Sequence, residues 1–95
     1  MMKRKHDEIY KKLRFNITYE RKMQGLSQLQ LAERAGISRT HMSNIEAPNG
    51  DTLPSLDVLI DIAEALGVPV AKLFDFRDWY NITNSAPMLG ANLFL

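Results

Sequence analysis

The stretch SQLQLAERAGISRTHMSNIEA, residues 27–47, indicates two short helices joined by a tight turn. Ser27 and Gln30 form a capping box, in which each side chain satisfies a backbone N–H at a helix start, so a helix is expected directly after Ser27. Gly36 marks the turn, because glycine adopts positive φ at little steric cost. Ser38 then offers a hydroxyl to cap a second helix, which runs to about the end of the stretch.

Apolar residues in this stretch repeat at helical spacing and indicate how the two helices meet. The buried face is expected to consist of Leu31, Ala32, Ala35, Ile37, Met42 and Ile45. With that face buried, the second helix presents a row of hydrogen-bonding side chains on its opposite side. This row consists of Arg39, Thr40, Ser43 and Asn44. Such side chains suit base edges and phosphate groups.

A longer pattern includes this stretch. Its positions within the stretch are Gln28, Leu31, Ala32, Gly36, Ile37, Ser38, Met42, Ser43, Ile45 and Glu46; before it they are Ile17, Arg21, Gly25, Leu26 and Ser27; after it they are Pro54, Leu56, Leu59, Ile62, Ala63, Leu66, Gly67, Val68, Leu73 and Phe74. The pattern resembles the Cro/CI-type helix-turn-helix repressors of the XRE family. The resemblance covers about residues 9–75 and implies an all-α fold, a compact five-helix lambda-repressor-like DNA-binding domain, followed by an apolar C-terminal tail.

Helical periodicity before the stretch predicts a first helix over about residues 7–24, which Gly25 ends. Its buried stripe is expected to consist of Ile9, Leu13 and Ile17. The chain is therefore expected to divide into three parts. These are a basic flexible arm at 1–6, the Cro/CI-type domain at 7–75, and a tail at 76–95 that serves dimerisation or partner binding.

The second half of the domain is expected to hold two more helices. Pro54 and Ser55 start the first of them, whose core face is expected to consist of Leu56, Leu59, Ile62, Ala63 and Leu66. Gly67 ends this helix, and a last short helix follows. In that last helix Leu73 and Phe74 are expected to close the core.

The charge of the chain is unevenly distributed, although its net value is only +1. Residues 1–24 carry eight basic and three acidic side chains, whereas residues 48–75 carry one basic and five acidic side chains. A polyanion should therefore be attracted to the end of the molecule that holds the first helix. A solvated basic N-terminus without a ligand is an equally good interpretation of this feature taken alone.

Composition excludes several classes of function. There is no cysteine, which rules out disulfides and thiolate zinc sites and fits a reducing, cytoplasmic compartment. No secretory signal and no membrane segment is expected. Asp57, Asp61 and Glu64 are interpreted as a solvated helix face, because no histidine or second carboxylate cluster converges on them. Neither a metal, another cofactor nor an enzymatic activity is expected, since no nucleophile–base pair or glycine-rich phosphate loop is present.

The resemblance implies double-stranded DNA as the partner, with the second helix of the stretch in the major groove. Arg39 is the strongest candidate for reading bases, because a guanidinium can bond guanine O6 and N7 together. Thr40 can contact a thymine methyl, and Asn44 can bond adenine through two atoms. Contacts to the DNA backbone are expected from Gln28, Ser38, Ser43, Lys22 and Asn49. For Gln28, bracing of the DNA-reading helix is the alternative.

The tail after Asp78 has no charged side chain, and its apolar surface would be costly to leave in water. The residues expected to contact a dimer mate or another partner are Trp79, Tyr80, Ile82, Leu89 and Phe94. A homodimer on an inverted-repeat operator is the preferred interpretation, with the chain acting as a transcriptional regulator of the repressor kind. The alternative is an antitoxin-type protein, whose tail binds a partner protein while the helix-turn-helix autoregulates.

Overall fold

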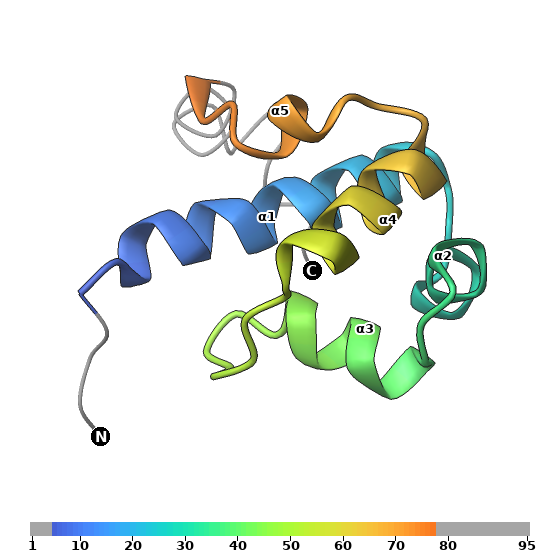
Figure 1. Ribbon diagram of the computed structural model, residues 1–95, viewed down its shortest axis with the longest axis horizontal. Coiled ribbons are helices and arrows are strands. Elements are labelled where there is room, and N and C mark those ends of the chain that lie inside the picture. The colour runs from blue at the N-terminus through green and yellow to red at the C-terminus, as the bar shows by residue number, and fades with distance from the viewer. Residues whose placement is uncertain (1–4, 78–95) are drawn as a thin grey trace, which may run out of the picture.

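The computed structural model describes residues 5–77, which form five α-helices (Figure 1). They are α1 (Asp7–Met23), α2 (Gln28–Ala35), α3 (Arg39–Glu46), α4 (Leu56–Leu66) and α5 (Val70–Leu73). Within these described residues there is no β-strand. The predicted all-α, five-helix fold is confirmed, with helix starts and ends within a few residues of those expected.

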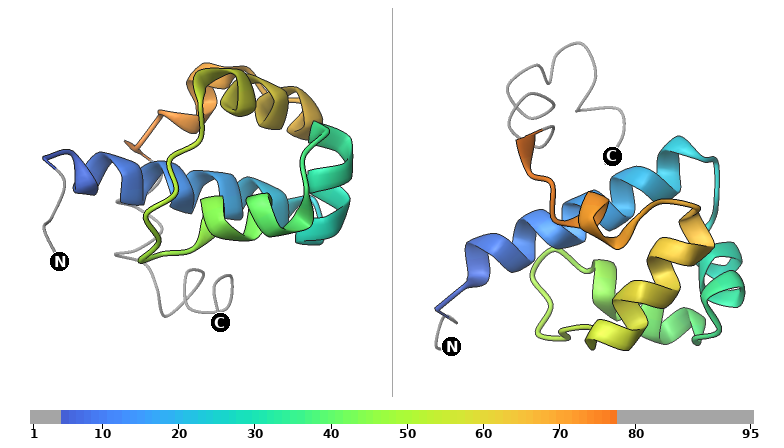
Figure 2. Two further views of the ribbon diagram at one scale, coloured as in Figure 1. Left: turned by 60° about the horizontal axis from the view of Figure 1, so that its bottom comes forward. Right: turned by 45° about the horizontal axis from the view of Figure 1, so that its top comes forward.

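The long helix α1 crosses the molecule and packs against α3, α4 and α5 (Figure 1). At one end of α1 lies α2, which packs against both α3 and α4 and so joins the two sides of the bundle (Figure 2). Every helix contributes to one core, whose largest fully buried side chains are Ile17, Leu31, Met42, Ile45, Ile62 and Leu73. Each such side chain stabilises the fold by roughly 1.5–3 kcal/mol through apolar burial. This core fixes α3 relative to the other helices.

The caps that the sequence predicts at the helix ends are present in the structure. Ser27, Ser38 and Ser55 each accept a hydrogen bond from the backbone N–H three residues later, at 3.0, 3.0 and 3.1 Å. Ser27 and Gln30 complete the capping box, since the Gln30 side chain accepts from the Ser27 backbone N–H at 2.8 Å. Gly36 ends α2 with a φ of +74°, a left-handed conformation that favours glycine. Gly36 and the Ser38 cap together define the turn between α2 and α3.

Three residues predicted to be buried are exposed: Ile9 by 45%, Leu56 by 66% and Phe74 by 43%. Ile9 lies in the first turn of α1, which extends past the neighbouring helices (Figure 1). Leu56 is the first residue of α4, and the helix packs against the core only from Val58 onwards. Phe74 follows the end of α5, and Leu73 alone of the two takes the core position. Helical periodicity predicted the buried face of each helix correctly, but it did not predict at which residues the neighbouring helices cease to cover that face.

None of the helices within residues 5–77 is long and apolar enough to cross a membrane. The same part of the chain contains no group of three or more histidine, cysteine, aspartate or glutamate side chains that could hold a metal ion.

Candidate nucleic-acid interface

The helix α3 has one buried and one exposed side. Met42, Ile45 and Glu46 are buried, whereas all four residues of the predicted polar row are exposed. That row consists of Arg39, Thr40, Ser43 and Asn44. The helix therefore presents guanidinium, hydroxyl and amide groups to solvent from a single turn-and-a-half of backbone. These groups can donate and accept hydrogen bonds of the kinds that base edges and phosphates offer.

The N-terminal end of α3 is capped by Ser38, the residue that directly precedes the helix. The Ser38 hydroxyl accepts the His41 backbone N–H at 3.0 Å, with Ser38 in an extended conformation. This is the usual geometry of a serine N-cap, which satisfies one of the orphan donors of the first turn. Both a cap and a contact to the DNA backbone were predicted for Ser38; the structure shows the cap, Ser38 is an exposed residue, and the contact to DNA stays a prediction.

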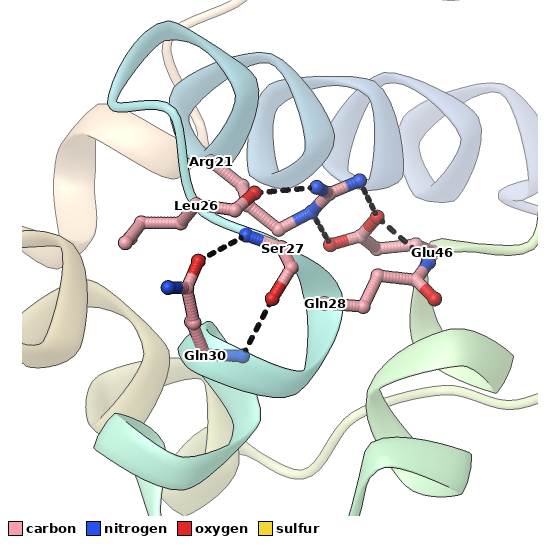
Figure 3. Close-up of polar contacts among 6 residues, drawn as sticks. All are labelled: Arg21, Leu26, Ser27, Gln28, Gln30 and Glu46. Atoms are coloured by element: carbon pink, nitrogen blue, oxygen red, sulfur yellow. Dashed lines mark hydrogen bonds and ion pairs between the residues drawn. The ribbon is translucent and has the colours of Figure 1, made fainter.

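The C-terminal residue of α3, Glu46, is held by a buried ion pair with Arg21 (Figure 3). Arg21 on α1 donates to both carboxylate oxygens of Glu46, from Nε at 2.8 Å and from Nη2 at 2.9 Å. The two residues are only 8% and 7% exposed. A bidentate guanidinium–carboxylate pair is among the strongest polar contacts in proteins. It ties α3 to α1 with a defined orientation.

Two further contacts extend this pair toward α2. Arg21 Nη1 donates to the backbone carbonyl of Leu26 at 2.8 Å, in the turn that leads into α2. Gln28 Nε2, in the first turn of α2, donates to Glu46 Oε1 at 3.2 Å (Figure 3). Of the two roles expected for Gln28, the structure shows the bracing contact to the end of α3. One carboxylate thus joins α1, α2 and α3.

The contact between Arg21 and Glu46 was not predicted from the sequence, although both residues were part of the pattern that carries the family resemblance. A signal was present in each helix. Arg21 follows Ile17 by four residues and therefore lies on the buried stripe of α1. Glu46 follows Met42 by four residues and shares the buried face of α3 in the same way. Two opposite charges on two core-facing stripes indicate an ion pair between the helices.

The other residues predicted to contact the DNA backbone lie in different parts of the fold. Ser43 is on the exposed side of α3, and Lys22 is half-buried in the last turn of α1. Asn49 is exposed in the loop between α3 and α4, where the Gly50 N–H donates to the Ala47 carbonyl at 3.1 Å. These placements test none of the three roles, which remain predictions.

The acidic side chains of α4 are separate from the polar row of α3. Asp57, Asp61 and Glu64 are all exposed, as expected for a solvated face. The predicted dimer or partner residues lie outside the described residues; they are Trp79, Tyr80, Ile82, Leu89 and Phe94. Most of the predicted basic arm, residues 1–4, lies outside them as well.

Comparison with known proteins shows that the sequence contains a helix-turn-helix domain. The profile of the helix-turn-helix family matches residues 17–73, more than half of the chain. The chain is 42% identical over 53 residues to the immunity repressor protein of Bacillus phage phi105, covering 56% of this chain and 35% of that protein. It is 31% identical over 83 residues to the HTH-type transcriptional regulator SinR of Bacillus licheniformis, covering 76% of this chain and 74% of that regulator. No solved structure gave a significant match.

Proposed function

Because the chain belongs to the XRE, or Cro/CI-type, family of helix-turn-helix transcriptional regulators, we propose that it binds double-stranded DNA in a sequence-specific manner and represses transcription. The observation that carries this proposal is the two-sided character of α3. Its polar row is exposed as a unit, while its other face is packed in the core and held by Arg21 and Gln28 through Glu46. A rigid helix with such a face fits the width of the major groove.

In the proposed complex α3 lies in the major groove and α2 crosses the DNA backbone. Arg39 donates two hydrogen bonds to a guanine, Thr40 contacts a thymine methyl, and Asn44 pairs with an adenine. All three side chains are exposed in the free protein, so binding requires no unpacking of the core. A good bidentate contact is worth about 1–3 kcal/mol of discrimination against a wrong base.

Contacts to the DNA backbone would set the register of α3 without reading sequence. We assign this role to Lys22, Ser43 and Asn49, together with the N-terminal ends of α2 and α3 at Gln28 and Ser38. Backbone N–H groups and the positive end of the helix dipole favour a phosphate at such ends. The uneven charge of the chain supports this orientation, because residues 1–24 carry eight basic and three acidic side chains, whereas residues 48–75 carry one basic and five acidic side chains.

We further propose that the protein acts as a homodimer, with residues 76–95 as the dimer element and an inverted repeat as the operator. The support is compositional: the segment after Asp78 contains eight large apolar side chains and no charged one. Two protomers related by a two-fold axis would place their α3 helices roughly 34 Å apart, one turn of B-DNA. If the segment instead binds a different protein, the chain fits the antitoxin-type alternative.

A selection experiment tests these proposals. The full chain is used to select binding sites from random DNA duplexes, and light scattering on the free and DNA-bound protein gives the number of protomers. We expect two inverted half-sites and a dimer. Arg39→Ala should relax preference at one position in each half-site, whereas Lys22→Ala should weaken binding to all sequences by a similar factor.

The matched control is Arg34→Ala, which removes the same charge from an exposed arginine at the end of α2. It should leave the base preference unchanged. A selection that yields no preferred sequence would refute the function. Equal behaviour of Arg39→Ala and Lys22→Ala would refute the assignment of roles. A monomer on a single half-site would refute the dimer.

A further inference from the structure

The C-terminal end of α3 is tied to α1 by a second arginine, which belongs to neither the polar row nor the Glu46 pair. Arg14 is 5% exposed in the middle of α1. Its Nη1 donates to the backbone carbonyls of Asn44, Ile45 and Ala47 at 3.3, 3.0 and 3.2 Å. Its Nη2 donates to the carbonyl of Thr52 at 2.8 Å. One guanidinium thus connects the last turn of α3 with Thr52 in the loop that follows.

The Arg14 contacts take the place of the glycine C-cap that α3 lacks. The helices α2 and α4 end at Gly36 and Gly67, whose left-handed conformation lets backbone N–H groups close the last turn. By contrast, α3 ends at Ala47, which is extended with φ −60° and ψ 121°. The last carbonyls of a helix have no partner within it and carry the negative end of its dipole. Arg14, a buried cation that donates to three carbonyls in this region, supplies these carbonyls with hydrogen-bond partners and places a positive charge at the negative end of the dipole.

The loop after α3 is held against the same end of the helix. The Gly50 N–H donates to the Ala47 carbonyl, and a Cβ at Gly50 would lie only 3.1 Å from Ala47 Cβ and 3.3 Å from the Asn44 carbonyl oxygen. Because Thr52 is bonded to Arg14 as well, the loop that carries Asn49 is anchored on both sides. The Asn44 end of α3 and the loop therefore have one common support.

We propose that Arg14 is a positioning residue that sets base preference at the C-terminal half of α3, an inference that rests on the proposed DNA-binding function. Arg14 is buried and touches no DNA in this scheme; it acts through the Asn44 backbone and the loop. Arg39, at the other end of α3, is positioned by the Ser38 cap and does not depend on Arg14. Loss of Arg14 should therefore change preference at one part of the half-site and not at the other.

The test compares Arg14→Met with Asn16→Leu in the full chain. Asn16 is also buried in α1 and donates to two carbonyls at the end of α5, of Leu73 at 2.9 Å and of Asp75 at 3.0 Å. Both variants remove buried donors from a helix end, but only the first removes them from α3. Binding is measured on duplexes that carry every single-base change in the selected half-site, at a temperature at which circular dichroism shows each variant fully folded.

We first use Asn44→Ala to find the base pair that Asn44 reads. Arg14→Met should lower the preference there by about tenfold, within the range of one bidentate contact, and change the preference at the Arg39 position by less than about twofold. In the Asn44→Ala background Arg14→Met should cause no further loss at that base pair. Asn16→Leu should leave both preferences unchanged, and Arg14→Lys, which keeps the charge, should restore part of the lost preference.

Amide hydrogen exchange, measured without DNA, tests whether Arg14 holds the loop against the end of α3. In Arg14→Met, or in Arg14→Lys if the methionine variant does not fold, the Gly50 amide should exchange its hydrogen faster than in the wild type, while amides in the middle of α1 and α4 should not. An unchanged base profile in the folded variant, a uniform loss at all sequences, or an equal loss in Asn16→Leu would overturn the inference. So would an Asn44→Ala variant without effect on any base pair, although DNA binding would still stand. A wild-type chain that selects no sequence would overturn the proposed function and this inference with it.

Discussion

The two ends of α3 are held by different means. The N-terminal end is capped by Ser38, the residue that directly precedes the helix, through an exposed and uncharged hydrogen bond. The C-terminal end is held by Arg14 and Arg21, which lie at least 25 residues earlier in the chain and act through buried, charged groups. The helix that we propose to read DNA is thus fixed locally at one end and by the tertiary fold at the other.

This difference has an energetic consequence. Solvent can replace a lost hydrogen bond at the exposed end, so the cap contributes only about 0.5–2 kcal/mol. At the buried end water cannot reach a partner that has lost its contact, and the unpaired charge costs about 3–5 kcal/mol. Substitutions at the two ends should therefore differ in the free energy of unfolding, although both change contacts of the same helix.

The largest effect is expected from Arg21→Met. The substitution keeps an apolar stem in α1 but leaves the Glu46 carboxylate buried with only the 3.2 Å bond from Gln28. It also removes the donor to the Leu26 carbonyl. We expect the free energy of unfolding, measured by urea denaturation followed by circular dichroism, to fall by about 3–5 kcal/mol.

The control for this prediction is the double variant Arg21→Met, Glu46→Met. It removes both charges and replaces them with side chains of adaptable shape. Replacing a buried ion pair by apolar residues is often neutral or stabilising, so the double variant should be more stable than Arg21→Met alone. If the two substitutions instead added their separate losses, the pair would not act as a coupled unit.

A smaller effect is expected from Ser38→Ala at the other end of α3. Loss of the hydroxyl leaves the His41 N–H to solvent, and the free energy of unfolding should fall by about 1 kcal/mol in the same urea titration. Ser55→Ala is the matched control, because Ser55 caps α4 through the same contact to the Val58 N–H at 3.1 Å. Similar losses in both variants are expected. A loss at Ser38 as large as that of Arg21→Met would show that the two ends of α3 do not differ as proposed.

The same division between local and distant contacts explains what the sequence could predict. Some features depend only on residues within three or four positions of one another, so they can be recognised from the sequence. They are the capping box at Ser27, the turn at Gly36 and the cap at Ser38. The exposed side of α3 also followed from helical spacing alone. These features are enough to give the two helices of residues 27–47 and the location of the polar row, whereas the all-α, five-helix fold was implied by the family resemblance.

The Arg14 contacts could not be derived in the same way, unlike the Arg21–Glu46 pair, whose two residues share the spacing of the buried stripes. The contacts of Arg14 with carbonyls up to 38 residues later are backbone contacts, which leave no pattern in side-chain identity. The exposure of Ile9 and Phe74 has a related cause, since periodicity identifies the face of a helix but not the point at which its neighbours end. Roles in DNA contact remain predictions for every residue of the site, because they depend on a partner that the fold does not contain.

The smallest effect is expected from Asp75→Asn, which separates the importance of charge from that of burial. Asp75 and Arg77 form an ion pair at 2.7 Å, but the Arg77 side chain is 87% exposed and the two residues are near neighbours in sequence. The hydrogen bonds from Arg77 lower the pKa of Asp75 from 3.8 to about 2. A lowered carboxyl pKa stabilises the folded state above the unfolded value, and that contribution is lost as the pH falls through about 2.

Thermal unfolding of Asp75→Asn and the wild type, measured from pH 7 to pH 2, should therefore show a small difference that persists to about pH 4 and disappears near pH 2. Asp61→Asn, an exposed aspartate on α4, corrects for the change in net charge. Because solvent screens this pair, its loss should lower the unfolding midpoint less than Ser38→Ala does. A larger shift than that of Ser38→Ala would mean that charge, and not burial, makes the C-terminal support of α3 the stronger one.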